Sequence, residues 1–358
     1  EEAYVLPLTE AQMAGVPQAV RDAAAACALE RGVTAPYAVT LSRSSVEPML
    51  QYADDRTLRE QLFRAWVARG DNDNDRNNTD VMTQMLALRA ERAALLGYEN
   101  FAAFKLADSM AGTPARARAL LEEVWHPARA KALAERDALQ ALIAREGGNF
   151  RLAPWDWRYY AEKLRRERYD FDEAQLKPYF QLENLIQAAF FTARKLFGLT
   201  FRPRTDIPVY HPDVRVWEVV REEAVIGLFY GDYFARTGKQ GGAWMSSFRD
   251  QERVNGARDG DEVLPLVINN CNFNKAQPCL LSFDDAVTLF HEFGHALHGL
   301  LSQVRFPRLS GTNVARDFVE LPSQLYEHWL EEPQVLERFA RHHETGQPIP
   351  AALLEKLL

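Results

Sequence analysis

The sequence has little of what secreted and membrane proteins rely on. Its 358 residues include three cysteines, Cys27, Cys271 and Cys279, an odd number spread widely along the chain. A disulfide framework is therefore not expected, and a reducing, cytoplasmic compartment is favoured. No apolar run reaches the roughly 18 residues that a membrane span needs, and no basic and then apolar leader opens the chain. We expect no contact with a membrane.

Basic charge is also lacking. The chain carries 42 Lys and Arg against 50 Asp and Glu, which gives a formal net charge of -8. Nucleic acids and anionic membranes both attract a basic face, so nucleic acid is not expected as a partner. With 47% hydrophobic and 26% charged residues, the composition is that of a globular protein with a sizeable core, in one large or two smaller domains.

Neither end of the chain looks like the end of a protein. It opens with Glu1-Glu-Ala-Tyr4, without a methionine, and closes within the helix-like pattern of residues 351–358. We therefore expect a piece of a longer protein, truncated at both ends, in which a missing leader carries little weight.

Helical periodicity dominates the first half of the sequence. Helices are predicted at Gln18–Arg31, Val46–Arg69, Thr79–Leu96 and Pro114–Arg145, and a helical run at Leu152–Phe201. The acidic stretch from Asp71 resembles the start of a calcium loop, but Arg76 and Met82 stand where that loop requires glycine and glutamate. Capping of the next helix by Asn78 or Thr79 is the better interpretation.

The periodicity then changes to that of strands. Strands are predicted at Val214–Val220 and Ile226–Phe234, joined by a hairpin at residues 221–224, and at Val263–Asn269. Glycines at 238, 241 and 242 would permit another backbone to approach closely. The pattern predicts a mainly α protein with a small sheet.

Immediately after these strands, residues 289–301 read LFHEFGHALHGLL. Ser282 and Asp285 fit a capping box, which predicts a helix from Phe283 to Leu301. On that helix His291 and His295 lie on one face, about 6 Å apart along the axis and about 40° around it. Two imidazoles so placed can share one metal ion, and the apolar residues around them would sequester the pair.

The pattern His-Glu-x-x-His has a known chemical use. Two neutral imidazoles bind zinc, while the glutamate between them, here Glu292, takes a proton from zinc-bound water. The alternative is the exposed polar face of a structural helix, which the apolar flanks disfavour. Gly294, in the middle of this helix, costs about 1 kcal/mol relative to alanine, and close approach of a second helix is a plausible reason.

A catalytic zinc site needs a third protein ligand. His298 lies about 10.5 Å along the axis from His291 and cannot converge on the same ion. Glu320 is the better candidate, because apolar residues flank this carboxylate on both sides.

Several motifs together resemble one family. His291–His298, Ser310–Asn313 and Asp317–Gln324 are similar to the thimet oligopeptidase family of zinc metallopeptidases, whose third ligand is a glutamate 25 residues after the second histidine, as Glu320 is after His295. The segments that more closely resemble its bacterial peptidyl-dipeptidase (dipeptidyl carboxypeptidase) branch are Tyr210–Trp217, Gly241–Met245, Asn270–Asn274 and Glu327–Trp329. The resemblance runs through essentially the whole chain.

The resemblance implies a multi-helical, zincin-like fold with the small sheet next to the zinc helix. Residues 1–205 would form a helical region on one side of a substrate channel, and residues 206–358 the catalytic region. One Zn²⁺ would be held by His291, His295 and Glu320, with Glu292 as general base. Gly242 and Ala243 would belong to a substrate-binding strand, unless they form an ordinary tight turn. Gln324, one turn after Glu320, would be a hydrogen-bond partner of a ligand histidine.

The implied activity is hydrolysis of short peptides with release of dipeptides from the free C-terminus. Two alternatives stay open: an oligopeptide endopeptidase of the same family, and a helical binding scaffold with a non-catalytic zinc site. The family's oxyanion-stabilising tyrosine and histidine come from a segment well beyond the third ligand. None of the available residues, Tyr326, His328, His342 and His343, fits that motif. We expect the missing C-terminal segment to complete the site, and this chain alone to be weak or inactive.

Overall fold

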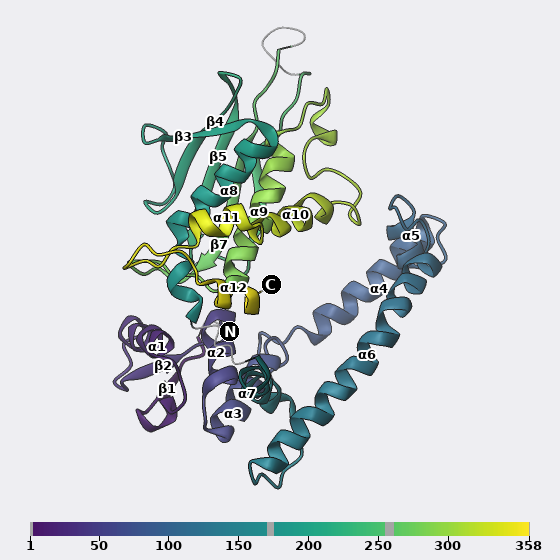
Figure 1. The fold of residues 1–358 in the computed structure, drawn as a ribbon. Helices are drawn as coiled ribbons and strands as arrows, with labels where there is room; N and C mark the ends of the chain where they lie inside the picture. The colour runs from purple at the N-terminus through teal and green to yellow at the C-terminus, as the bar shows by residue number, and fades with distance from the viewer. Residues whose placement is uncertain (1–2, 170–174, 255–260, 358) are drawn as a thin grey trace. The chain divides into compact units, whose positions relative to one another are not determined.

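A computed structural model describes residues 3–169, 175–254 and 261–357. The chain forms two compact units, Glu1–Asp170 and Phe171–Leu358 (Figure 1). The division expected at residue 205 therefore falls inside the second unit, because the helix and strand before residue 205 pack on that unit's sheet and zinc-motif helix. The fold is mainly α with a small sheet, as predicted.

The first unit is almost entirely helical. Its elements are β1 (Leu6–Leu8), η1 (Ala11–Met13), α1 (Gln18–Glu30), β2 (Tyr37–Val39), α2 (Arg43–Tyr52), α3 (Arg56–Val67), α4 (Thr79–Leu95), α5 (Phe101–Leu106), α6 (Pro114–Arg145), η2 (Pro154–Asp156) and α7 (Trp157–Tyr169). The three-residue strands β1 and β2 pair antiparallel and are too short to show an alternating pattern.

Two local predictions in this unit were wrong in detail. The helix expected at Val46–Arg69 is broken between α2 and α3, because Asp55 accepts hydrogen bonds from the backbone N–H groups of Thr57 and Leu58 and so begins a new helix. Asn78 stands at the N-cap of α4, but its side chain makes no capping hydrogen bond. The side chain of Asn77 accepts from the Thr79 N–H instead.

The second unit combines a five-stranded sheet with helices. Its elements are η4 (Lys177–Tyr179), α8 (Leu182–Phe197), β3 (Leu199–Arg204), β4 (Arg215–Arg221), β5 (Ala224–Phe234), β6 (Trp244–Arg249), β7 (Leu266–Phe273), α9 (Phe283–Leu300), η5 (Pro307–Leu309), α10 (Glu320–Glu327), η6 (His328–Leu330), α11 (Pro333–Phe339) and α12 (Ala351–Leu357). The strand order is β3-β4-β5-β7-β6, with β5 and β7 parallel and the other pairs antiparallel.

The predicted hairpin joins β4 to β5. Glu222 and Glu223 have positive φ angles of 48° and 67°, the backbone sign that a two-residue type I′ hairpin turn requires. Two described strands of the second unit, β3 and β6, were not predicted. The helical run expected to reach Phe201 stops at Gly198, whose φ of 72° ends α8, and β3 follows directly. The edge strand β6 follows the glycine-rich stretch.

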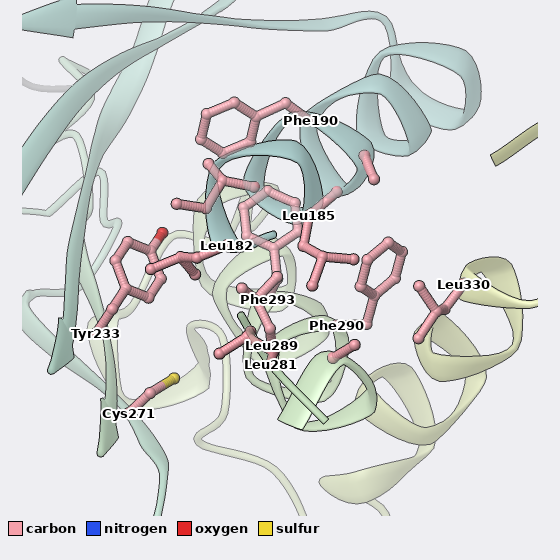
Figure 2. Packing of buried hydrophobic residues seen from close by; sticks show 14 of the residues in the cluster. Leu182, Leu185, Phe190, Tyr233, Cys271, Leu281, Leu289, Phe290, Phe293 and Leu330 are labelled. Atoms are coloured by element: carbon pink, nitrogen blue, oxygen red, sulfur yellow. The ribbon is translucent and has the colours of Figure 1, made fainter. Parts of the chain in front are cut away.

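Helix α9 is covered on several sides by other elements of this unit. It packs on β5, β6 and β7, on α8 and on α10. Phe293 is fully buried and lies near Phe190 of α8 and Phe290 of its own helix (Figure 2). Its ring centroid is 5.2 to 5.7 Å from those of four other aromatic rings. Those rings belong to Phe190, Phe201, Phe229 and Tyr326. Burying so much aromatic surface fixes the rotation of α9 about its axis.

The cysteines agree with the sequence analysis. All three are free thiols, with Cys271 and Cys279 buried and Cys27 half-buried. Among the described residues, none of the helices has the length and apolar character that crossing a membrane would take.

Candidate metal centre

Helix α9 begins as the sequence predicts. The Ser282 side chain accepts a hydrogen bond from the Asp285 N–H (3.1 Å), and the Asp285 carboxylate accepts one from the Ser282 N–H (3.2 Å). This reciprocal capping fixes where the first turn starts and hence which residues share a face. His291 and His295 emerge together, with ring centroids 4.9 Å apart.

Helix α10 crosses close to α9 at Gly294. A Cβ at Gly294 would lie 2.7 Å from the Ser323 Cα and 2.9 Å from the Pro322 carbonyl oxygen, both backbone atoms that cannot swing away. The glycine in the zinc motif therefore admits the second helix. The buried Tyr326 hydroxyl of α10 donates to the Ala189 carbonyl of α8 at 2.8 Å and helps to hold α10 in place.

The approach of α10 brings Glu320 onto the two histidines. Its Oε2 lies 3.2 Å from the Nε2 of His291 and 3.1 Å from the Nε2 of His295. A tetrahedral zinc ion with bonds of about 2.1 Å would separate its ligand atoms by about 3.4 Å, which is close to both distances. The three ligand atoms all lie within 4.8 Å of one another, as a shared ion requires. The Glu320 side chain is 51% exposed, which leaves one side of the group open.

Two neighbours orient two of the three side chains, those of His291 and Glu320. Glu327 Oε1 lies 2.5 Å from the Nδ1 of His291, an arrangement that places a proton on Nδ1 and turns the Nε2 lone pair toward Glu320. The Ser323 hydroxyl lies 3.0 Å from the Oε2 of Glu320 and 2.9 Å from its carbonyl oxygen.

Glu327, rather than Gln324, contacts His291. Gln324 is exposed, and no hydrogen bond to either histidine is found for it among the described residues. A signal for Glu327 was available, because it follows Glu320 by seven residues, two turns along the same helical face.

Glu292 is positioned for a different role. It is buried, with no hydrogen-bond partner for its Oε2 among the described residues. Burial raises the pKa of Glu292 to about 7, assisted by Glu320, while His291 and a backbone hydrogen bond at Met245 of β6 act in the opposite direction. A carboxyl group with a pKa near neutrality is suited to accept and return a proton. The contact at Met245 also places this group beside the edge strand.

Burial affects the other two histidines of the helix. It lowers the pKa of His295, partly offset by Glu320, and it lowers the pKa of His298, so both favour the neutral form. His298 is not part of the converging group, in agreement with the spacing argument.

The two predicted substrate residues lie at the start of β6. Gly242 has a φ of 95° and Ala243 directly precedes Trp244, the first residue of the strand. Because β6 pairs with β7 on one side only, its other edge is unpaired within the part of the chain that the structure describes.

A second group of possible ligands lies near the C-terminal end, at His342, His343 and Glu344. The His342 Nδ1 already accepts a hydrogen bond from the Glu344 N–H, at 3.3 Å. These three consecutive residues lack both the burial and the orienting carboxylate of the group on α9 and α10.

Comparison with known proteins agrees with this geometry. The profile of peptidase family M3 matches residues 49–358. The chain is 46% identical over 353 residues to a dipeptidyl carboxypeptidase of Escherichia coli K12, covering 97% of this chain and 51% of that protein. It is 39% identical over 358 residues to oligopeptidase A of the same organism, covering 98% and 52%.

A plant relative is more distant: an organellar oligopeptidase A of Arabidopsis thaliana is 35% identical over 332 residues, covering 90% of this chain and 42% of that protein. The chain thus spans about half the length of the curated relatives it matches. The family resemblance drawn from the motifs is confirmed, and the chain belongs to peptidase family M3.

Proposed function

We propose that the protein containing this chain is a zinc peptidase that acts on short oligopeptides and releases dipeptides from their free C-terminus. The observation that carries the proposal is the convergence of His291, His295 and Glu320 beside the buried Glu292. The 46% identity to a dipeptidyl carboxypeptidase supports the C-terminal specificity.

Each residue has a defined task in this proposal. His291, His295 and Glu320 would hold the ion, which when bound supplies a Lewis acid for the scissile carbonyl and acidifies water. Glu292 takes the proton of the attacking water and returns it to the leaving amine. The substrate backbone lies along the unpaired edge of β6, near Gly242 and Ala243, as an added strand.

The release of dipeptides can be tested by changing the C-terminus of the substrate. A peptidyl-dipeptidase should lose most of its activity when a peptide with a free carboxylate is replaced by its amide. Equal cleavage of the two would instead favour the second candidate, an oligopeptide endopeptidase, which the 39% identity to oligopeptidase A also supports.

Hydrolysis itself is tested at Glu292. In the full-length protein, Glu292→Gln should retain zinc, measured by elemental analysis, and lose about 100- to 10,000-fold in rate with the proton acceptor. Unchanged hydrolysis would exclude Glu292 as the base. Zinc binding without hydrolysis in the unmodified protein would favour a non-catalytic scaffold.

We also propose that the protein is cytoplasmic.

We further propose that a C-terminal segment beyond this chain supplies the oxyanion donor. The buried Tyr326 hydroxyl is committed to the Ala189 carbonyl and is not offered to a substrate. Loss of an oxyanion donor typically costs about 100- to 1,000-fold in rate. Comparing residues 1–358 with the full-length protein, at equal zinc content, tests the missing segment: equal rates would refute it.

A further inference from the structure

The connection between β5 and β6 has an unusual course. Since β7 lies between these two strands in the sheet, residues 235–243 must pass over the carboxyl end of β7 to reach Trp244. This connection, which we call the crossover loop, includes Gly238 and Gly242, whose φ angles are 80° and 95°. A glycine-rich loop loses much conformational entropy on ordering, so specific contacts must hold it.

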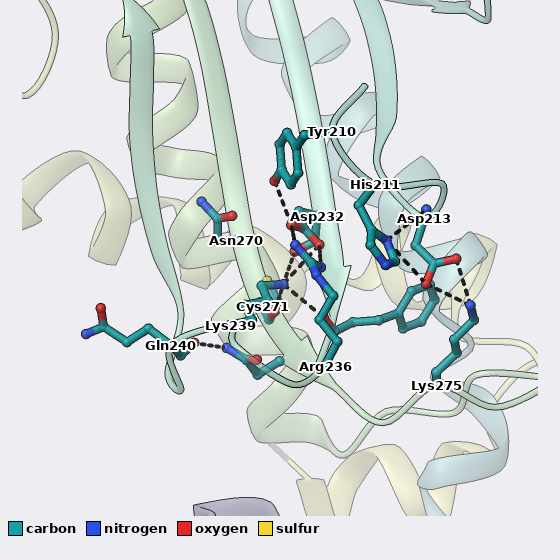
Figure 3. Close-up of polar contacts among 12 residues, drawn as sticks. Tyr210, His211, Asp213, Asp232, Arg236, Lys239, Gln240, Asn270, Cys271 and Lys275 are labelled. Atoms are coloured by element: carbon teal, nitrogen blue, oxygen red, sulfur yellow. Dashed lines mark hydrogen bonds and ion pairs between the residues drawn. The ribbon is translucent and has the colours of Figure 1, made fainter. Parts of the chain in front are cut away.

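One buried ammonium group provides four of those contacts. The Lys239 side chain is 4% exposed, and its Nζ lies 3.0 Å from the carbonyl oxygens of Asp232 and Phe234 and 2.5 Å from that of Cys271. It also lies 3.0 Å from the Oδ1 of Asp232. The carbonyls belong to the last residues of β5 and β7, so Lys239 ties the crossover loop to the ends of both strands (Figure 3).

The carboxylate that balances this charge is fixed from other sides. Arg236 donates to both oxygens of Asp232 at 2.7 Å, and the Tyr210 hydroxyl donates at 2.6 Å (Figure 3). Burial alone would raise the pKa of Asp232, but the hydrogen bonds from Arg236, Tyr210 and Lys239 outweigh it and lower the pKa to about 2. Asp232 is therefore a permanent anion around which the loop is organised.

A second side chain of β7 holds the other end of the loop. The Asn272 Nδ2 donates to the carbonyl oxygens of Gln240 and Gly242, at 2.8 and 2.7 Å. Lys239 and Asn272 thus fix the loop immediately before β6 begins. Three residues after Gly242, Met245 contacts Glu292 through its backbone.

We propose that Lys239, together with Asn272, is a positioning residue for the peptide substrate. By holding the crossover loop, it fixes the position of the β6 edge relative to Glu292. This inference rests on the proposed function, because it assigns the β6 edge to the peptide. A compact ammonium suits a site with four surrounding oxygens, whereas the planar guanidinium of arginine does not.

The test uses the full-length protein with Lys239→Met and, because loss of a buried charge could impair folding, the milder Asn272→Ala. The matched control is Lys275→Met, the same substitution at a nearby lysine that is 61% exposed and pairs with Asp213 at 2.7 Å (Figure 3). We expect both test variants to raise KM for peptides about 10-fold, to keep zinc content and to change kcat by less than about twofold, while the control behaves as the unmodified protein.

Hydrogen exchange provides a readout independent of activity. Backbone amides of residues 240–249 should exchange faster in Lys239→Met and Asn272→Ala than in Lys275→Met, with α9 and α10 unaffected. Equal exchange in all three would overturn the positioning role, whether or not the protein cleaves peptides. Faster exchange with an unchanged KM would overturn the link to substrate. An unmodified protein that cleaves nothing would refute the proposed function instead, and the exchange result would still decide whether Lys239 holds β6.

Discussion

Helices α4 and α9 carry comparable apolar residues, but α9 buries most of them whereas α4 exposes most of them. On α9, eleven residues are buried, Glu292 and His295 among them. On α4, only Ala93 is buried, and Leu86 and Leu88 are 63% and 64% exposed. The neighbouring α6 likewise exposes Leu121 (69%) and Trp125 (60%) and buries only residues near its C-terminal end.

The difference shows that an apolar stripe on a helix requires a packing partner but does not identify that partner. The sheet, α8 and α10 meet that requirement for α9 from several sides. Nothing in the described part of the first unit covers most of α4. The polar side chains of the candidate metal centre are costly to bury, and they lie on α9, which other elements cover on several sides. Rigid surroundings of this kind keep the side chains converged.

The largest expected effect is on packing around α9. Phe293→Ala removes a ring enclosed by four others and should lower the free energy of unfolding by about 3–5 kcal/mol, measured by chemical denaturation. Leu121→Ala on α6 is the matched control and should change it by less than about 0.5 kcal/mol. Similar losses at the two sites would remove the distinction between the helices.

Crowding the α9–α10 contact should have the next largest effect. In Gly294→Ala the new methyl group meets backbone atoms of Pro322 and Ser323, so α10 must shift, at a cost of about 1–3 kcal/mol, and Glu320 moves with it. Zinc affinity should fall, as measured by competition with a chelator.

Gly299→Ala provides the control on the same helix. Its methyl group would lie 3.0 Å from the flexible end of Met245 and from a methyl of Val267, which can yield slightly. If this variant lost as much zinc affinity as Gly294→Ala, the close crossing at Gly294 would not be what brings Glu320 to the histidines.

Removing the orienting carboxylate should have a smaller effect. Glu327→Gln weakens the hold on the His291 ring and should reduce zinc affinity about 10- to 100-fold, in this chain as in the full-length protein. Gln324→Ala, on the same helix, should leave the affinity unchanged. The reverse result would restore Gln324 as the partner of a ligand histidine.

The smallest effect is expected on α4. Leu86→Gln and Leu88→Gln should each change the free energy of unfolding by less than about 0.5 kcal/mol, because both side chains are already exposed. Leu142→Gln, at a position only 4% exposed in α6, places an amide in the core and should destabilise the same unit clearly. Marked destabilisation by the α4 variants would show that α4 is covered in solution.

Local signals explain which elements could be predicted. The capping box of α9, the hairpin between β4 and β5 and the long helices α4 and α6 depend on residues close in sequence, and these predictions are confirmed. The break at Asp55 was missed because the apolar period continues across it, although a capping residue was present. Strand β3 was missed because Leu199 and Phe201 also fit the preceding helical period, and only the left-handed Gly198 separates them from α8.

The sequence by itself determined that two imidazoles, those of His291 and His295, would share one face of a capped helix, since a period of 3.6 residues fixes that geometry locally. It also pointed to Glu320, by its apolar flanks and by resemblance. Only the tertiary structure decided that Gly294 admits α10, that Glu327 orients His291, and that Lys239 ties the crossover loop to two strand ends. Each of these depends on the distance between segments far apart in the chain, which packing sets and periodicity does not encode.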